Sequence, residues 1–179
     1  RVLEAAHLIS EKNLAQIVLF DEERASSLDV SSINLKNEDL RLEYAQTLFE
    51  LRKHKGVTPE SALEMLSSPS VCAMVALHRS EVDGVVTGAI TPSQEVLSSA
   101  LRIIGVSESS SLVSSLFLMV FDKDHKRYGE NLIFTDCAMN ISPSSDELAE
   151  IACNAYETAQ SFLDEDPKLA MLSFSTNQS

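Results

Sequence analysis

The sequence predicts an α/β protein with a largely parallel β-sheet. Segments whose apolar residues recur at helical spacing alternate with short apolar runs typical of buried strands, along nearly the whole chain. Hydrophobic residues make up 44% of the 179 residues, which is enough for one domain with a buried core. The chain shows no internal repeat and no linker rich in proline and glycine. These observations favour a single folded domain over a string of modules.

Helices are predicted where apolar residues share one face and capping residues mark an end. Gly56 stands where a helix-terminating glycine belongs, Thr58 and Pro59 are typical of a helix start, and Ser144 with Glu147 forms a capping box. The predicted helices cover 2–12, 39–54, a short stretch from Thr58, 71–78, 96–104 and a segment that begins after Ser144.

Strands are predicted at five apolar runs: 17–20, 82–89, 112–121, 132–136 and 169–174. Ligands of parallel sheets collect beyond the carboxyl ends of the strands. The segments 87–94, 136–140 and 173–179 are therefore candidate binding segments.

Charge and composition exclude several classes of protein. The formal net charge of −13 opposes binding to nucleic acid, so an anionic ligand needs a local basic site, and the densest one is the run 52–55. No apolar run is long enough to span a membrane, and the first residues lack the pattern of a signal peptide. The three cysteines lack metal-site spacing and fit reduced thiols. We expect a cytoplasmic protein with no metal site and no membrane partner.

Six segments resemble, in order and spacing, the signatures of the phosphate acetyl/butyryl transferase family. They are Glu50–Gly56, Val82–Ala89, Val113–Met119, Phe134–Asn140, Ser142–Ala152 and Pro167–Thr176. The resemblance implies a three-layer α/β fold with the two-domain architecture of isocitrate and isopropylmalate dehydrogenases. It also implies a homodimer, and it makes residues 1–179 part of one transferase domain.

The function implied by this resemblance is the reversible transfer of an acetyl group between acetyl phosphate and coenzyme A. Coenzyme A is then a substrate, and no cofactor is expected. Two alternatives stay open: transfer of a butyryl group, and a non-catalytic acyl-CoA-sensing domain such as that of the large malic enzymes. The catalytic aspartate and the Ser-Arg pair of the family have no counterpart in these residues. We therefore expect a fragment without its extreme N-terminus and C-terminal half, which is inactive when isolated.

Two arginines are candidate phosphate ligands. Arg52 matches a family arginine associated with phosphate binding, and a guanidinium presents a fork of donors to phosphate oxygens. The alternative is a solvated residue that faces the negative end of a helix dipole. A second family arginine is replaced by Ser98, and Arg102 follows four residues later on the same helical face. Arg102 either substitutes for the lost arginine or is an ordinary surface residue.

Hydroxyl and glycine residues after two predicted strands complete the candidate site. Gly88, Thr91 and Ser93 form a small-residue loop that lets phosphate or pantetheine approach a helix N-terminus, or else an ordinary tight turn. Ser175 and Thr176 are either hydroxyls at the edge of a cleft or the end of a strand.

Asp136 and Asn140 also follow a predicted strand. A role in a binding cleft is one interpretation, and hydrogen bonding at the entry to the next helix is the other, which we favour.

Overall fold

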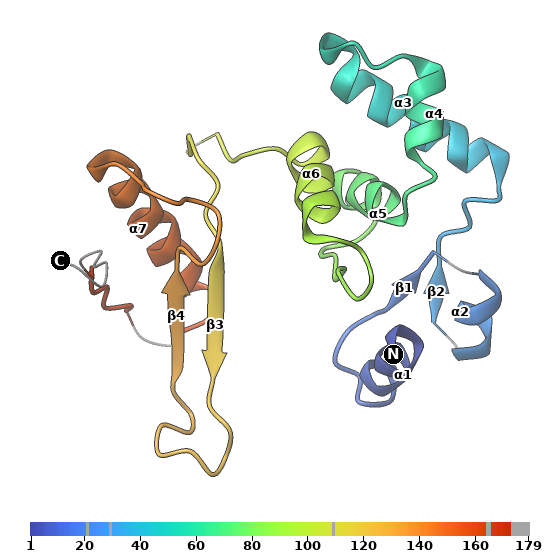
Figure 1. The fold of residues 1–179 in the computed structure, drawn as a ribbon. Helices are drawn as coiled ribbons and strands as arrows, with labels where there is room; N and C mark the ends of the chain where they lie inside the picture. The colour runs from blue at the N-terminus through green and yellow to red at the C-terminus, as the bar shows by residue number, and fades with distance from the viewer. Residues whose placement is uncertain (21, 29, 109, 164–165, 173–179) are drawn as a thin grey trace. The chain divides into compact units, whose positions relative to one another are not determined.

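The computed structural model describes residues 1–20, 22–28, 30–108, 110–163 and 166–172 and divides into two compact units, Arg1–Gly105 and Val106–Ser179 (Figure 1). The first unit contains α1 (Val2–Glu11), β1 (Val18–Leu19), α2 (Glu22–Leu28), β2 (Ser31–Ser32), α3 (Glu38–Arg52), the 3₁₀ turn η1 (Lys53–Lys55), α4 (Pro59–Met65), α5 (Pro69–His78) and α6 (Ser93–Ile103). The second contains β3 (Leu116–Val120), β4 (Asn131–Thr135) and α7 (Ser145–Gln160).

The core of the first unit lies between α3, α4, α5 and α6. Tyr44 and Leu48 of α3 and Val75 of α5 are fully buried, and Ile103 of α6 joins them. Helix α5 is apolar on all sides, as expected of a helix surrounded by others. Its Cys72 is buried as well, and burial raises the pKa of this thiol to about 11. The cysteine therefore behaves as a small apolar residue.

Local chemistry fixes the ends of these helices. The side chain of Asn37 accepts a hydrogen bond from the Leu40 N–H at the start of α3, and Thr58 caps α4 in a reciprocal pair with Ser61. Gly56, with φ of 83°, ends the turn that follows α3, so the predicted helix-terminating glycine is confirmed. These positions depend on neighbours in the sequence and were accessible to sequence analysis.

The second unit contains a β-hairpin and helix α7, which packs against it. Strands β3 and β4 are antiparallel, with Leu116 opposite Thr135 and Val120 opposite Asn131. Helix α7 begins with the predicted capping box of Ser144 and packs against β4 (Figure 1). The buried residues of α7 are Ile151, Ala155 and Ala159.

The predicted α/β class is confirmed, but the predicted sheet is not. Among the described residues the strand pairs are the parallel pair β1–β2, with two residues per strand, and the antiparallel pair β3–β4, with five. A hairpin forms because the connection 121–130 is a series of turns that reverses the chain. No three-layer arrangement is visible in this part of the chain.

Two predicted strands are wrong where the structure describes them. Residues 82–89 form no strand, and the sequence Asp83-Gly84 interrupts their apolar run. Residues 169–172 are also unpaired; they line a cavity of about 400 Å³ together with β4 and α7. The remainder of the predicted strand 169–174 lies outside the described residues. Helix α2, in contrast, occupies a segment for which the sequence analysis predicts neither helix nor strand.

Within the described residues, no helix combines the length and apolarity that crossing a membrane requires. The same residues contain no group of three or more histidine, cysteine, aspartate or glutamate side chains that could hold a metal ion.

Candidate functional site

Arg52 is the last residue of α3 and is half-buried. It follows Tyr44 and Leu48 at intervals of one helical turn, so its stem continues the buried face of the helix. Its side chain forms no hydrogen bond or ion pair with any residue that the structure describes. The neighbouring Lys53, by comparison, pairs with Glu50. Arg52 is therefore a guanidinium whose donors are available to a ligand.

The local backbone keeps this guanidinium at the end of a helix. The Gly56 N–H donates to the Lys53 carbonyl over 3.0 Å and the Val57 N–H to the Arg52 carbonyl over 3.4 Å, which closes the helix in a tight turn. The basic run 52–55 thus lies at the negative end of the α3 dipole, which favours positive charge in the folded chain. Helix stabilisation and anion binding are both consistent with this position.

Residues 82–92, which include most of the candidate segment 87–94, form a loop that leads into α6, and we call it the loop 82–92. Gly88 is exposed and has a φ of 93°, a backbone conformation that side chains other than glycine rarely adopt. Thr91 is half-buried and Ser93 is the first residue of α6. Pro92 occupies the N-cap and supplies no side-chain cap; the Glu95 N–H in the first turn of α6 donates to the Pro92 carbonyl over 3.0 Å. The loop brings the expected glycine and hydroxyls to a helix N-terminus, although no strand precedes it.

Arg102 lies in the last turn of α6 and is exposed. Ser98 lies one turn earlier and is half-buried, so the expected geometric relation between these two residues is present. The rise of the helix separates Ser93 from Arg102 by about 14 Å along the axis. The loop and Arg102 would therefore contact different groups of a ligand.

Asp136 has a structural role in the second unit. Its carboxylate accepts hydrogen bonds from the Ser115 N–H over 2.7 Å, the Ser115 hydroxyl over 2.6 Å and the Asn140 N–H over 2.6 Å. Burial alone favours the neutral acid, but the hydrogen bonds from Ser115 and Asn140 outweigh it and hold the pKa of Asp136 well below its usual range. These contacts organise the chain directly after β4. The favoured interpretation expected hydrogen bonds at the entry to the next helix, and none of these contacts of Asp136 reaches α7.

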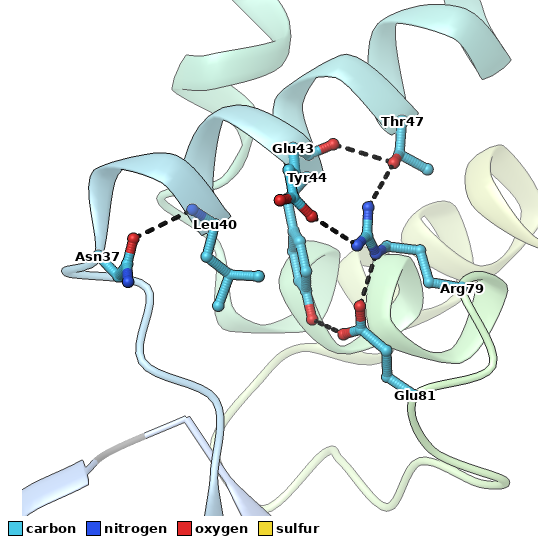
Figure 2. A network of polar contacts seen from close by, with 7 residues as sticks. All are labelled: Asn37, Leu40, Glu43, Tyr44, Thr47, Arg79 and Glu81. Atoms are coloured by element: carbon cyan, nitrogen blue, oxygen red, sulfur yellow. Dashed lines mark hydrogen bonds and ion pairs between the residues drawn. The ribbon is translucent and has the colours of Figure 1, made fainter.

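Sequence analysis missed a polar cluster in the first unit, which we call the Arg79 cluster: Glu43, Tyr44, Thr47, Arg79 and Glu81 (Figure 2). The Arg79 guanidinium donates to Glu43 over 2.8 Å, to Glu81 over 2.6 Å and to the Thr47 hydroxyl over 3.2 Å. It lies 5.2 Å from the centre of the Tyr44 ring, and the Tyr44 hydroxyl donates to Glu81. Only the helical spacing of Glu43, Tyr44 and Thr47 was visible in the sequence.

The structure thus places Arg52, the loop with Gly88, Thr91 and Ser93, and Arg102 in the first unit, on or beside helices that share one core. Ser175 and Thr176 lie outside the described residues. A guanidinium with no side-chain partner among the described residues and a helix N-terminus are groups with which proteins can hold anionic ligands.

Comparisons with known proteins identify the family. The model of the family described as phosphate acetyl/butaryl transferase matches residues 1–179, and the chain belongs to this family. The chain is similar to the phosphate acetyltransferase of Clostridium acetobutylicum, with 41% identity over 189 residues that cover 98% of this chain and 56% of that protein. The phosphate acetyltransferase of Acetivibrio thermocellus is 33% identical, with 98% of this chain and 55% of that protein covered.

Solved structures show the same likeness. A phosphotransacetylase from Streptococcus pyogenes matches with a TM-score of 0.81 and 34% identity, over 99% of this chain and 55% of that one. The EutD phosphotransacetylase from Staphylococcus aureus matches with a TM-score of 0.79 and 33% identity, over 98% and 54%. The chain therefore spans about half the length of these relatives.

Proposed function

We propose that this chain is part of a phosphate acetyltransferase, which transfers an acetyl group reversibly between acetyl phosphate and coenzyme A. The observation that carries the proposal is the family match along residues 1–179, together with relatives of more than 30% identity that are named phosphate acetyltransferase. Coenzyme A acts as a substrate, and the reaction needs no resident cofactor.

The guanidinium of Arg52, which has no side-chain partner in the part of the chain that the structure describes, supports the phosphate half of this proposal. On a chain with a net charge of −13, most of the surface repels acetyl phosphate, so binding depends on local cations. Arg52 donates charge-assisted hydrogen bonds to the phosphate oxygens and stabilises the charge that phosphate carries as it leaves. Gly88, Thr91 and Ser93 offer backbone N–H and hydroxyl donors to the remaining polar groups of the substrates, and we assign the same role to Ser175 and Thr176.

The reaction forms one bond and breaks one. The thiolate of coenzyme A attacks the carbonyl carbon of acetyl phosphate, the carbon–sulfur bond forms, and the carbon–oxygen bond to phosphate breaks. The proton of the thiol passes to a carboxylate base, as in general-base catalysis. We assign no described residue as this base; the Asp136 carboxylate is already engaged by Ser115 and Asn140.

The full-length protein tests this function directly. Acetyl phosphate and butyryl phosphate are each supplied with coenzyme A, and thioester formation is followed by ultraviolet absorbance. We expect acetyl-CoA to form with a kcat/KM at least about tenfold above that for butyryl-CoA, since pocket size discriminates added methylenes by this order. A preference for butyryl phosphate would assign a butyryltransferase. Coenzyme A binding without turnover would assign a sensing domain, and the loss of an arginine at Ser98 is the feature that favours it.

Arg102 is proposed to compensate for the arginine replaced by Ser98. Side chains of a helix lean toward its N-terminus, so the guanidinium of Arg102 reaches back toward Ser98 one turn away. Its exposure and its lack of a side-chain partner among the described residues leave it available for this role. In the full-length enzyme, Arg102→Ala should raise the KM for acetyl phosphate more than the KM for coenzyme A. Unchanged constants would make Arg102 an ordinary surface residue.

We extend the proposal to the whole protein: a cytoplasmic homodimer with the three-layer, two-domain architecture of its family. The TM-scores near 0.8 to solved phosphotransacetylases support the architecture. Light scattering of the purified full-length protein should give the mass of two chains, and the mass of one chain would contradict the dimer.

A further inference from the structure

We propose that the Arg79 cluster is a positioning device that holds α3, with Arg52 at its end, in register with the start of the loop 82–92. The inference rests on the proposed function, because that function makes both segments ligand-bearing. It follows from the contacts that one guanidinium and one phenol make with two carboxylates in the first unit (Figure 2).

The first set of contacts joins Arg79 to α3. Glu43 and Thr47 lie on one face of this helix, and Arg79 donates to both. Thr47 precedes Arg52 by about one and a half turns of the same helix, so any rotation of α3 about its axis moves the Arg52 guanidinium as well. Three nitrogens of Arg79 engage three different partners, which fixes the orientation of its planar group.

The second set of contacts holds Glu81, the residue from which the loop 82–92 begins. Glu81 directly precedes Val82, and its two oxygens are both engaged: one accepts from Arg79 and the other from the Tyr44 hydroxyl. The backbone adds to this hold, because the Glu81 N–H donates to the Ala76 carbonyl over 3.0 Å at the end of α5. The loop therefore leaves from a residue that cannot rotate without breaking contacts to α3.

The contact between Tyr44 and Glu81 is the most shielded part of the cluster, whereas the Glu43 side chain is 58% exposed. Tyr44 is fully buried, and the side chains of Arg79 and Glu81 are 27% and 30% exposed. Polar contacts in a low-dielectric surrounding are stronger and more directional than the same contacts in water. The three contacts made by Glu43, Tyr44 and Thr47 join segments more than thirty residues apart in sequence, so they act between elements and not within one helix.

The test is Tyr44→Phe in the full-length enzyme, which removes one hydroxyl and keeps the buried ring. Tyr128→Phe, at an exposed tyrosine of the hairpin turn, is the matched control. We expect Tyr44→Phe to raise the KM for acetyl phosphate about threefold to tenfold, less than the loss of a direct charged contact to phosphate would, because Tyr44 acts on the ligand-bearing segments only through Glu81. The kcat should stay within about twofold, because binding groups and not reacting groups are displaced. The control should match the wild type.

A second pair of variants separates positioning from simple stabilisation. Glu81→Gln keeps an oxygen that accepts from Tyr44, whereas Glu81→Ala removes both contacts. A larger KM increase in Glu81→Ala than in Glu81→Gln supports the inference. A lower melting temperature with unchanged KM in Tyr44→Phe and Glu81→Ala would show a purely structural cluster and overturn it. A wild-type protein that forms no thioester would remove the proposed function and this inference together, whereas an active enzyme with unaltered constants in the variants would overturn the inference alone.

Discussion

The two units each bind a carboxylate between segments that are distant in sequence, but they do so with different chemistry. In the first unit, Glu81 is held by the cation Arg79 and by the phenol of Tyr44. In the second, Asp136 is held by neutral donors, chiefly N–H and hydroxyl groups of Ser115 and Asn140. The stability that each cluster contributes should therefore change in opposite directions with pH. Removing each cluster should also lower the free energy of unfolding by a different amount.

The pKa shifts follow from this difference. Neutral donors favour the charged form of Asp136 and lower its pKa despite burial. In the first unit, burial and then the contact with Glu81 raise the pKa of Tyr44 well above its usual value. The stability contributed by Asp136 in the second unit therefore decreases at low pH, and the stability contributed by Tyr44 in the first unit decreases at high pH.

The largest effect on stability is expected from Asp136→Ala. This variant leaves the N–H groups of Ser115, Met139 and Asn140 without their acceptor, and we expect a loss of about 3 kcal/mol in the free energy of unfolding. Urea denaturation of the full-length protein measures it. Asp124→Ala, in the exposed hairpin turn, should cost less than about 0.5 kcal/mol. Equal losses in the two variants would contradict the role of Asp136.

A smaller loss, about 2 kcal/mol, is expected from Arg79→Met, which leaves Glu43 and Glu81 without their cation. Arg127 is the matched control: it also contacts a carboxylate, Glu130, and lies over an aromatic ring. However, Arg127 and Glu130 are three residues apart and partly exposed, so Arg127→Met should cost less than about 0.5 kcal/mol. Similar midpoints of urea denaturation for the two variants would contradict the larger contribution to stability that we assign to Arg79.

The acid dependence comes next in size. The pKa of Asp136 is lowered on folding, so its contribution is complete above the unfolded pKa of about 3.9 and is lost as pH falls toward the folded value. Between about pH 6 and about pH 3, wild type should lose about 1.3 kcal/mol relative to Asp136→Asn. Denaturation curves at these two pH values give the difference. A constant gap between wild type and variant would show that Asp136 is not held in its charged form.

The smallest effect is the alkaline one. The pKa of Tyr44 is raised on folding, so its contribution is complete below the unfolded pKa of about 10 and is lost as pH rises. Between about pH 9 and about pH 10.5, wild type should lose about 0.8 kcal/mol relative to Tyr44→Phe. Parallel stability curves for the two proteins would refute the assignment of the shift to this tyrosine.

Local features of the fold were predictable, and features that join distant segments were not. The capping box of Ser144 and the glycine at Gly56 depend on residues within one turn, and both are confirmed. The apolar run 82–89 had the composition of a strand, but a strand also needs a partner, which composition does not provide. The Arg79 cluster escaped prediction for the same reason, since it depends on how α3 and the end of α5 meet in three dimensions.

The candidate site shows the same limit. The spacing around Arg52 is equally compatible with a solvated helix end, and the resemblance to a family is what favoured phosphate binding. The structure adds that Arg52 has no side-chain partner among the residues it describes, which sequence analysis had no means of showing.

The most direct test of this account is the KM for acetyl phosphate of Arg52→Ala in the full-length enzyme. Loss of a charge-assisted contact to phosphate should raise this constant about tenfold to a hundredfold and leave the KM for coenzyme A nearly unchanged. Arg41→Ala, which removes an exposed arginine from the same helix, is the control and should behave as wild type. If Arg52→Ala and Arg41→Ala both keep the wild-type KM for acetyl phosphate, Arg52 does not bind the phosphate group, and the proposed site is wrong.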